Sequence, residues 1–513
     1  MRLAAVAAGL TVLGSLTAPP AQAAPPAGIH WKACTEAALH GLQCGALTVP
    51  LDPARPGGRK ISIAVTRARH RGKHGYQGVL LLDPGGPGGS GRAFSADVAA
   101  EAPASLRAAY DLIGFDPRGV GGSRPALSCE PDYFKPVRPD YVPRSPRDEL
   151  VWLERSKEYA DACGRKYGSL LDHMKTVDAV RDMDALRVAL HQQKINYFGA
   201  SYGTYLGAVY ATLYPHRVRR MVLDSNVRPS GVWYGDNLDQ DYAFDASVRA
   251  SFGWIAAHAA VYHLGTTETA VEKAYYSLRA RLRTAPIAKT IGPDELDDTW
   301  QVGAYLAPAW PLLAQAWSDY AVHGKPAKLL DRYKAWGAAK EGEFAVYNAV
   351  QCSDTVWPQN WGIWRSDAET IYRKAPYQAW GNTWFNAPCL YWPAKPGTPV
   401  KIGATAGRDK DFPKILLFQA TLDAATPYSG GLEMHKLLPG SRLVIEDGGR
   451  THAVVLRGNA CIDTKFTAYL KTGRLPADMT RCRRLPDPVP ASGGRRPGSR
   501  IRPELGLEMP VIR

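Results

Sequence analysis

The sequence predicts an α/β fold: a mostly parallel sheet with helices on both faces, interrupted by a helical cap insertion. Short apolar segments alternate with helical stretches in the first half of the chain, which is typical of parallel strands joined by helices. The composition then shifts, because 12 of the 14 tryptophans lie between Trp233 and Trp392 in a stretch that is mainly helical in pattern. Strand-like segments return only near the C-terminus, so one sheet is predicted to be split by a long aromatic insertion.

Each predicted element is a short range of the printed sequence. The expected strands are 78–82, 112–115, 195–198, 218–223, 415–418 and 442–445, and the expected helices nearest the site are 178–190, 202–214 and 431–438. The predicted organisation is a signal peptide at 1–23, a first part of the core at 24–228, a helical cap at 229–404, a second part of the core at 405–482 and a basic flexible tail at 483–513.

The N-terminus has the pattern of an export signal. Arg2 precedes a mostly apolar run at 3–16, and Ala21-Gln22-Ala23 is a small-x-small cleavage site. The run is too short to cross a bilayer, and no later stretch is apolar for long enough to be a transmembrane helix. We therefore expect a secreted, extracellular protein without a membrane span.

The cysteines agree with export. There are eight, and none shows the paired Cys-x-x-Cys spacing with nearby histidines that metal sites have. Four disulfides are predicted rather than a metal site, and no cofactor is required. The spacing leaves the connectivity open; the sequence neighbours are Cys34 and Cys44, Cys129 and Cys163, Cys352 and Cys389, and Cys461 and Cys482.

The net charge of +15 does not by itself indicate nucleic-acid binding. Much of it sits in the tail after Cys482, without a basic helix or interleaved aromatic residues. A solvated tail is the favoured interpretation, and we expect no nucleic-acid partner.

A serine nucleophile is predicted at Ser201. Residues 199–203 read Gly-Ala-Ser-Tyr-Gly, the Gly-x-Ser-x-Gly pattern of the strained turn that presents the nucleophile in α/β-hydrolases. An expected strand precedes the pattern and an expected helix follows it, which is the context that this turn requires. The pattern alone is weak evidence, because Gly and Ser also form ordinary turns.

In this fold the triad residues follow the order serine, acid, histidine along the chain. The acid and the histidine are therefore expected after the last strands. His452 follows the final expected strand in a loop, whereas His435 falls within an expected helix. Asp423 follows the preceding strand, and Asp447 is the runner-up for the acid. The predicted triad is therefore Ser201, Asp423 and His452.

The oxyanion of an acyl-transfer reaction needs two backbone N–H donors. The residue after the nucleophile, Tyr202, is expected to supply one. Gly86, in the glycine-rich run 85–91 after the first expected strand, is expected to supply the other. A phosphate-binding loop is the competing interpretation of this run, but the Gly-Lys-Ser/Thr ending is missing.

Taken together, these residues resemble the secreted tripeptidyl aminopeptidases of actinobacteria, relatives of proline iminopeptidase in the α/β-hydrolase superfamily. The matching strings are Pro-Gly-Gly-Pro-Gly-Gly-Ser-Gly at 84–91, Asp-Pro-Arg-Gly-Val-Gly-Gly-Ser at 116–123, Gly-Ala-Ser-Tyr-Gly-Thr-Tyr-Leu-Gly at 199–207 and Asp-Ala-Ala-Thr-Pro at 423–427. His452, with Cys461 and the Tyr-Leu pair at 469–470, completes the likeness. Two departures are Asp83, where relatives often have Asn, and the turn Gly-Arg-Thr-His at 449–452.

The resemblance implies an extracellular exopeptidase whose substrates are peptides with a free N-terminus, from which it releases short peptides, expected to be tripeptides. It also implies that 405–482 is a C-terminal segment shared by the group. An aminopeptidase must bind an α-ammonium, and a carboxylate in the cap would serve. Asp354 is the first candidate; the other candidates are Asp236, Asp239, Asp241 and Asp245.

Two other functions fit the same residues. The same triad can cleave a peptide bond or an ester, so a secreted esterase is the nearest alternative. An inactive binding protein on a hydrolase scaffold is the alternative from another class, although all three triad residues are present.

Overall fold

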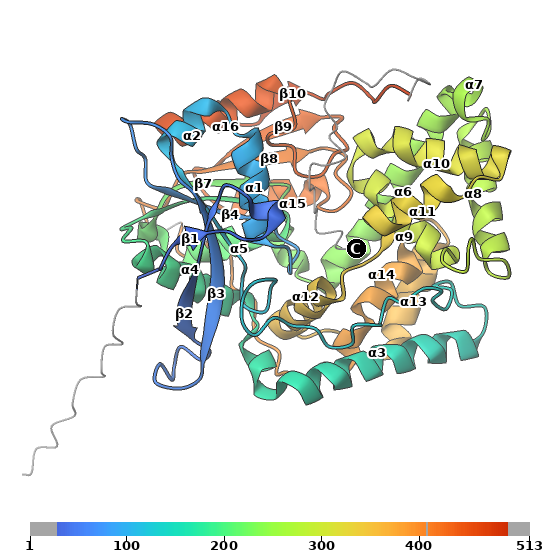
Figure 1. Ribbon diagram of the computed structural model, residues 1–513, viewed down its shortest axis with the longest axis horizontal. Helices are drawn as coiled ribbons and strands as arrows, with labels where there is room; N and C mark the ends of the chain where they lie inside the picture. The colour runs from blue at the N-terminus through green and yellow to red at the C-terminus, as the bar shows by residue number, and fades with distance from the viewer. Residues whose placement is uncertain (1–27, 407–408, 491–513) are drawn as a thin grey trace, which may run out of the picture.

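The computed structural model describes residues 28–406 and 409–490. They form a ten-stranded sheet with helices on both faces and a helical layer beside it (Figure 1). The predicted signal peptide at 1–23 and residues 491–513 of the predicted tail lie outside the described residues.

The sheet has the strand order β1-β2-β3-β5-β4-β6-β7-β8-β9-β10. Neighbours from β5 to β10 in this order pair in parallel, whereas β1–β2, β2–β3 and β3–β5 are antiparallel pairs. The bounds are β1 (Lys32–Ala33), β2 (Gln43–Pro50), β3 (Lys60–Ala68), β4 (Val79–Asp83), β5 (Asp111–Phe115), β6 (Ile195–Ala200), β7 (Val218–Asp224), β8 (Ile415–Ala420), β9 (Arg442–Asp447) and β10 (Thr480–Arg483). The six predicted strands are all present, and the predicted α/β-hydrolase fold is confirmed.

The helices fall into two groups. Those outside the segment between β7 and β8 are α1 (Gly91–Glu101), α2 (Ala104–Ala109), α3 (Pro146–Tyr167), α4 (Thr176–Ala189), α5 (Tyr202–Leu213), α15 (Tyr428–Leu437) and α16 (Ala460–Thr472). Those between β7 and β8 are α6 (Tyr234–Ala257), α7 (Ala259–Tyr262), α8 (Glu268–Leu282), α9 (Pro293–Tyr305), α10 (Trp310–His323), α11 (Ala327–Arg332), α12 (Glu341–Asp354), α13 (Trp361–Tyr372) and α14 (Ala379–Asn386). Short 3-10 or π-helical segments are η1 (Ala37–Leu39), η2 (Gly168–His173), η3 (Pro215–Arg217), η4 (Pro229–Gly231), η5 (Ala307–Ala309), η6 (Tyr333–Gly337) and η7 (Ala387–Leu390).

The central strands are buried on both faces, because successive side chains point to opposite sides of a strand. In β4, Leu81 joins one hydrophobic cluster, which includes Val180 of α4 and Leu206 of α5. Leu80 and Leu82 join a second cluster with residues of α1, α2 and α16. Helices therefore cover both faces and leave the carboxyl edge of the parallel strands for the site.

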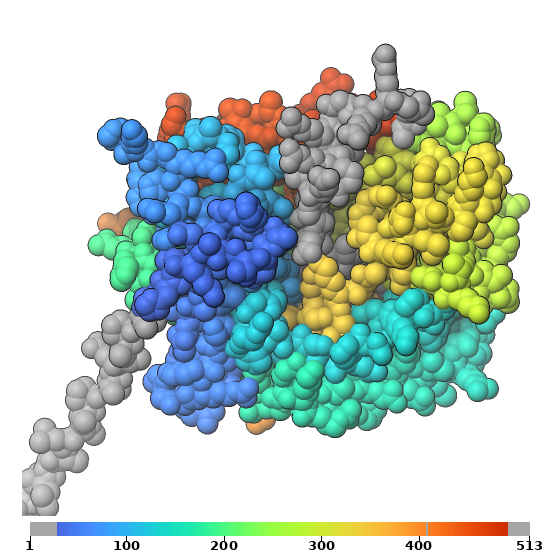
Figure 2. All heavy atoms as spheres, in the orientation of Figure 1, coloured from blue at the N-terminus to red at the C-terminus, as the bar shows by residue number. Residues whose placement is uncertain are grey.

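The helices between β7 and β8 form a layer with its own core, which includes Trp300 and Trp317. A long helical insertion was predicted here; its boundaries at 229 and 404 stay predictions. The helix α3 also packs against this layer, with the rings of Trp152 and Trp384 stacked at 5.9 Å between centroids. In the space-filling view the insertion stands beside the blue N-terminal part of the core, and the teal segment that contains α3 runs below (Figure 2).

All eight cysteines lie in disulfides between sequence neighbours: Cys34–Cys44, Cys129–Cys163, Cys352–Cys389 and Cys461–Cys482. The prediction of four disulfides is confirmed. Among the helices that the structure describes, none is long and apolar enough to cross a membrane.

Arg138 is expected to be essential for the stability of the helical layer. It lies on the segment before α3 and is buried against α9, where Nε is 2.9 Å from Glu295 Oε1 and Nη2 binds Asp298. Arg138→Met would leave two buried carboxylates without their cation, which typically costs about 3–5 kcal/mol. Urea unfolding of the variant would measure this loss.

Arg55→Met, which breaks an exposed pair with Asp52, is the control and should cost at most about 1 kcal/mol. Similar losses in both variants would contradict the prediction.

Candidate active site

Ser201 stands at the turn between β6 and α5, as predicted. Its backbone has φ 56° and ψ −128°, a conformation that a non-glycine residue adopts only under strain. The flanking residues must be glycine, because neither position has room for a Cβ atom. A Cβ on Gly199 would lie 2.4 Å from the carbonyl oxygen of Gly203, and one on Gly203 would lie 2.7 Å from that of Asp83. The close approach of strand, helix and loop therefore explains the Gly-x-Ser-x-Gly pattern.

His452 and Asp423 are brought together, as predicted. His452 Nδ1 lies 2.9 Å from both carboxylate oxygens of Asp423, and both side chains are buried. The carboxylate also accepts hydrogen bonds from the backbone N–H groups of Ala425 and Thr426, each at 3.0 Å, and from Thr426 Oγ1 at 3.1 Å. With Nδ1 directed at Asp423, the other ring nitrogen, Nε2, is available to a reacting group.

The runner-up acid and the histidine that was set aside both lie elsewhere. Asp447 is an exposed residue at the end of β9 and binds Arg481 at 2.8 Å. His435 lies on α15, where its Nδ1 is 2.7 Å from Ser441 Oγ. Neither lines the pocket that contains Ser201 and His452.

The loop after His452 is held by two residues that the sequence analysis missed. Asp224, the last residue of β7, accepts hydrogen bonds from the backbone N–H groups of Val454 at 3.1 Å and Val455 at 2.8 Å. The hydroxyl of the next residue, Ser225, accepts one from Ala453 at 2.8 Å. The signal was an aspartate ending a parallel strand, at the same edge as the predicted triad.

The glycine-rich loop lies directly against the nucleophile turn. A Cβ on Gly85 would lie 2.4 Å from the carbonyl oxygen of Ala200 and 2.7 Å from the backbone nitrogen of Tyr202. Gly85 and Gly86 both have positive φ, 93° and 118°. Gly86 and Tyr202 line the same pocket as Ser201, so their N–H groups stay the predicted oxyanion donors.

Asp83 fixes the start of this loop. One carboxyl oxygen, Oδ1, accepts the N–H of Gly85 at 2.8 Å, while Oδ2 has no hydrogen-bond partner among the described residues. Burial raises the pKa of Asp83 to about 7.

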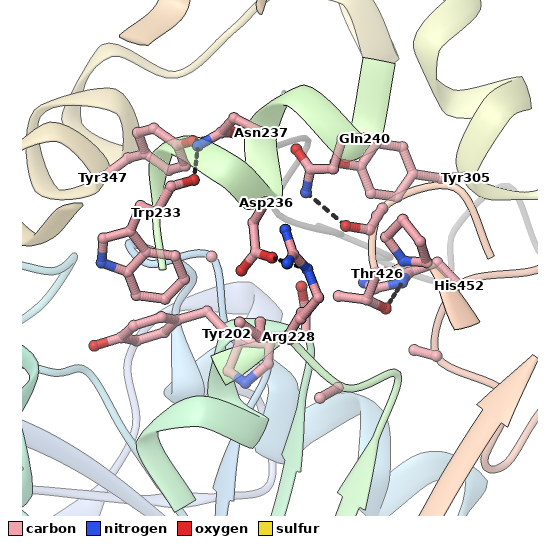
Figure 3. Close-up of a pocket in the computed structure, with 18 of the residues that line it drawn as sticks. Tyr202, Arg228, Trp233, Asp236, Asn237, Gln240, Tyr305, Tyr347, Thr426 and His452 are labelled. Carbon is pink, nitrogen blue, oxygen red and sulfur yellow. Dashed lines mark hydrogen bonds and ion pairs between the residues drawn. The ribbon is translucent and has the colours of Figure 1, made fainter. Parts of the chain in front are cut away.

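The pocket lies between the sheet edge and the helical insertion (Figure 3). The core supplies its floor, where Ser201 and His452 lie, and the insertion supplies a roof from Trp233, α6, Tyr305 and α12. The roof also holds the histidine, because the carbonyl oxygen of Tyr305 accepts the backbone N–H of His452 at 2.9 Å.

The prediction that Asp354 binds substrate is corrected by its contacts. Asp354 does not line the pocket. Its carboxylate accepts the backbone N–H of Thr176 at 2.7 Å, the hydroxyl of Thr176 at 2.5 Å and Trp233 Nε1 at 3.1 Å. Burial raises the pKa of Asp354 to about 6. With its carboxylate bound by protein donors, Asp354 ties α12 to α4 and to Trp233.

Of the other four acidic candidates, Asp236 alone lines the pocket. Asp241 accepts a hydrogen bond from Asn382 at 2.9 Å, and Asp245 lies 2.7 Å from Arg249. Asp239 is half exposed and lies 2.9 Å from Arg228.

Several proteins that have been assigned a name are similar in sequence to this chain over most of its length. A tripeptidyl aminopeptidase of Streptomyces lividans is 42% identical over 470 residues, which is 89% of this chain and 87% of the relative. The serine protease Hip1 of Mycobacterium tuberculosis is 31% identical over 86% of this chain and 87% of its own length. A carboxylesterase B of the same species is also 31% identical, over 88% of this chain and 89% of its own length. The family described as TAP-like protein matches residues 375–482.

Among solved structures, a proline iminopeptidase of Mycobacterium smegmatis matches with 16% identity and a TM-score of 0.38, over 83% of this chain and 97% of that one.

The carboxyl group of Asp224 is expected to make the free energy of unfolding depend on pH. Burial raises the pKa of its carboxyl to about 6, whereas an unfolded aspartate has a pKa of about 3.9. Between these values the folded protein keeps a proton that the unfolded chain has released. The contribution of Asp224 to the free energy of unfolding is therefore fully present below about pH 4 and is lost as pH rises through about 6.

Urea unfolding of the wild type and of Asp224→Asn at pH 4, 5, 6 and 7 measures this effect. The stability of the wild type relative to the variant should fall between pH 4 and 6, because Asn does not titrate. A difference that stays constant over this range would contradict the assignment. Asp447→Asn, at an exposed position on the same sheet edge, is the control.

Proposed function

Since this chain belongs to the family of the Streptomyces tripeptidyl aminopeptidases and is a serine hydrolase, we propose that it releases short peptides, tripeptides above all, from the free N-termini of peptides. The observation that carries the proposal is the pair formed by His452 and Asp423, at 2.9 Å, on a roofed pocket shared with Ser201. The relatives named as peptidases favour a peptide bond as the target.

The proposed reaction passes through an acyl-enzyme. His452 Nε2 takes the proton of Ser201 as Oγ attacks the carbonyl carbon of the scissile bond, and Asp423 stabilises the imidazolium. The N–H groups of Gly86 and Tyr202 bind the oxyanion. His452 then gives the proton to the leaving nitrogen as the C–N bond breaks. In the second half, His452 activates a water that hydrolyses the ester on Ser201.

An esterase is the second candidate, favoured by the relative named carboxylesterase B. Both activities need the same triad and oxyanion donors, and they differ in the leaving group and in what the roof binds. A substrate series therefore separates them better than any variant of the triad.

We also propose that the protein is exported. Four disulfides are typical of oxidising compartments outside the cytosol, and the N-terminal residues have the export pattern.

Ser201→Ala is expected to lower kcat for peptides by roughly 10⁴-fold or more, because the attacking oxygen is removed. Labelling by a serine-directed fluorophosphonate should disappear in the same variant. Ser230→Ala, an exposed serine bound to Glu433, is the matched control and should keep both. Peptidase turnover that persists in Ser201→Ala would refute the proposed nucleophile.

Specificity is tested with aminomethylcoumarin peptides: a free-amine tripeptide, its N-acetylated twin, and dipeptide and single-residue versions. The proposal expects the free tripeptide to be cleaved fastest. Equal cleavage of the acetylated twin would refute the exopeptidase assignment and leave a serine hydrolase of another specificity. Much faster cleavage of short acyl esters than of every peptide would favour the esterase.

A further inference from the structure

The roof of the pocket contains two buried acceptors without a donor. They are Asp236 Oδ2 and Gln240 Oε1, and neither has a hydrogen-bond partner among the described residues. Both side chains line the pocket, and they are four residues apart on α6, which places them on one face of the helix (Figure 3). Buried polar atoms in folded proteins are nearly always paired, so two unpaired acceptors on the lining of one pocket favour a ligand that carries donors.

The surroundings fix both groups in place. The amide nitrogen of Gln240 donates to the carbonyl oxygen of Ala425 at 2.5 Å, which leaves Oε1 as the free end of the amide. On Asp236, Oδ1 is the oxygen nearer Arg228, at 3.4 Å from Nε. Gly231 makes room for this carboxyl, because a Cβ there would lie 2.1 Å from Asp236 Oδ1.

The electrostatics favour a cation at this place. Arg228 is shared with a second carboxylate, that of Asp239, at 2.9 Å from Nη2. Asp239 and Glu433 add negative charge near Asp236, whereas Arg228 is the cation that pairs with Asp236 and with Asp239. Burial raises the pKa of Asp236 well above its usual range, a cost that a bound cation would offset.

A primary ammonium matches these acceptors in chemistry. It carries a positive charge and three N–H donors and has no acceptor. A neutral hydroxyl or amide would bring acceptors of its own and no charge. The floor holds the nucleophile and the roof holds the two orphan acceptors, so a peptide that spans the pocket would place its carbonyl at one and its N-terminus at the other.

Building on the proposed exopeptidase function, we infer that Asp236 Oδ2 and Gln240 Oε1 bind the α-ammonium of the substrate. This subsite takes the role that the sequence analysis gave to Asp354. It also provides the fixed point from which the number of released residues is counted, because the span from α6 to Ser201 must be filled by the acyl part of the peptide.

The test compares one free-amine substrate with its acetylated twin. Trialanyl aminomethylcoumarin has no basic side chain, so the α-ammonium is its only cation, and N-acetyl-trialanyl aminomethylcoumarin has none. Asp236→Asn keeps the shape and removes the charge. Its kcat/KM for the free substrate should fall about 10- to 100-fold, chiefly through KM, while the acetylated twin is unaffected. Gln240→Met should give a smaller loss of the same selectivity.

Asp239→Asn is the matched control. Asp239 lies on the same helix and contacts the same arginine, but it does not line the pocket. The Asp239→Asn variant should prefer the free-amine substrate over its acetylated twin as strongly as the wild type does. A general effect of charge near Arg228 would instead change Asp239→Asn and Asp236→Asn alike, and that result would overturn the inference.

A binding measurement removes the dependence on turnover. In the Ser201→Ala background, calorimetry should show trialanine binding more tightly than N-acetyl-trialanine, and Asp236→Asn should abolish the difference. If the wild type itself cleaves both twins equally, the exopeptidase proposal and the subsite fall together. If the wild type discriminates and Asp236→Asn discriminates equally well, the subsite alone is wrong.

Discussion

Asp224 joins the two halves of the proposed catalytic machinery. Its backbone carbonyl oxygen accepts the N–H of Ser201 at 3.0 Å, and its carboxylate accepts the N–H groups of Val454 and Val455, just after His452. One residue at the end of β7 thus fixes the nucleophile turn on one side and the histidine loop on the other. The geometry of serine and histidine depends on this link, since residues 201 and 452 come from distant parts of the chain.

The helical layer is a second support for the same loop, and not only a cover. Tyr305 at the end of α9 accepts the N–H of His452, and its ring lies 5.5 Å from the imidazole between centroids. Asp354 binds Thr176, whose hydroxyl lies 2.8 Å from the phenol oxygen of Tyr202. The roof is therefore connected by hydrogen bonds to the histidine on one side and, through Thr176, to the residue after the nucleophile on the other.

Where a site depends on chain order, the sequence alone predicts which loops meet. Ser201, Asp423 and His452 each follow a strand of the parallel sheet, and strands that end at one edge bring their loops together. Strands β1, β2, β3 and β10 were missed, because none of them is a continuous buried apolar run like the predicted strands. β2 and β3 mix buried and exposed residues, and β1 and β10 are short. Asp354 was misassigned and Asp224 overlooked for a shared reason. Whether an aspartate faces a ligand or a backbone N–H depends on how helices and loops pack, and residue type does not contain that information.

The acidic and amide side chains of the floor and of the roof differ in how many of their acceptor atoms receive a hydrogen bond from the protein. Asp423 accepts three protein hydrogen bonds besides its contact with His452, so the acid–base pair is formed before substrate arrives. Preorganised groups of this kind spend no free energy on rearrangement during the reaction. Asp236 and Gln240 each have an acceptor that the described protein atoms do not satisfy, and an unsatisfied buried acceptor costs free energy. A ligand with matching donors would recover that cost and one without them would not, so the proposed subsite would favour substrates with a free N-terminus.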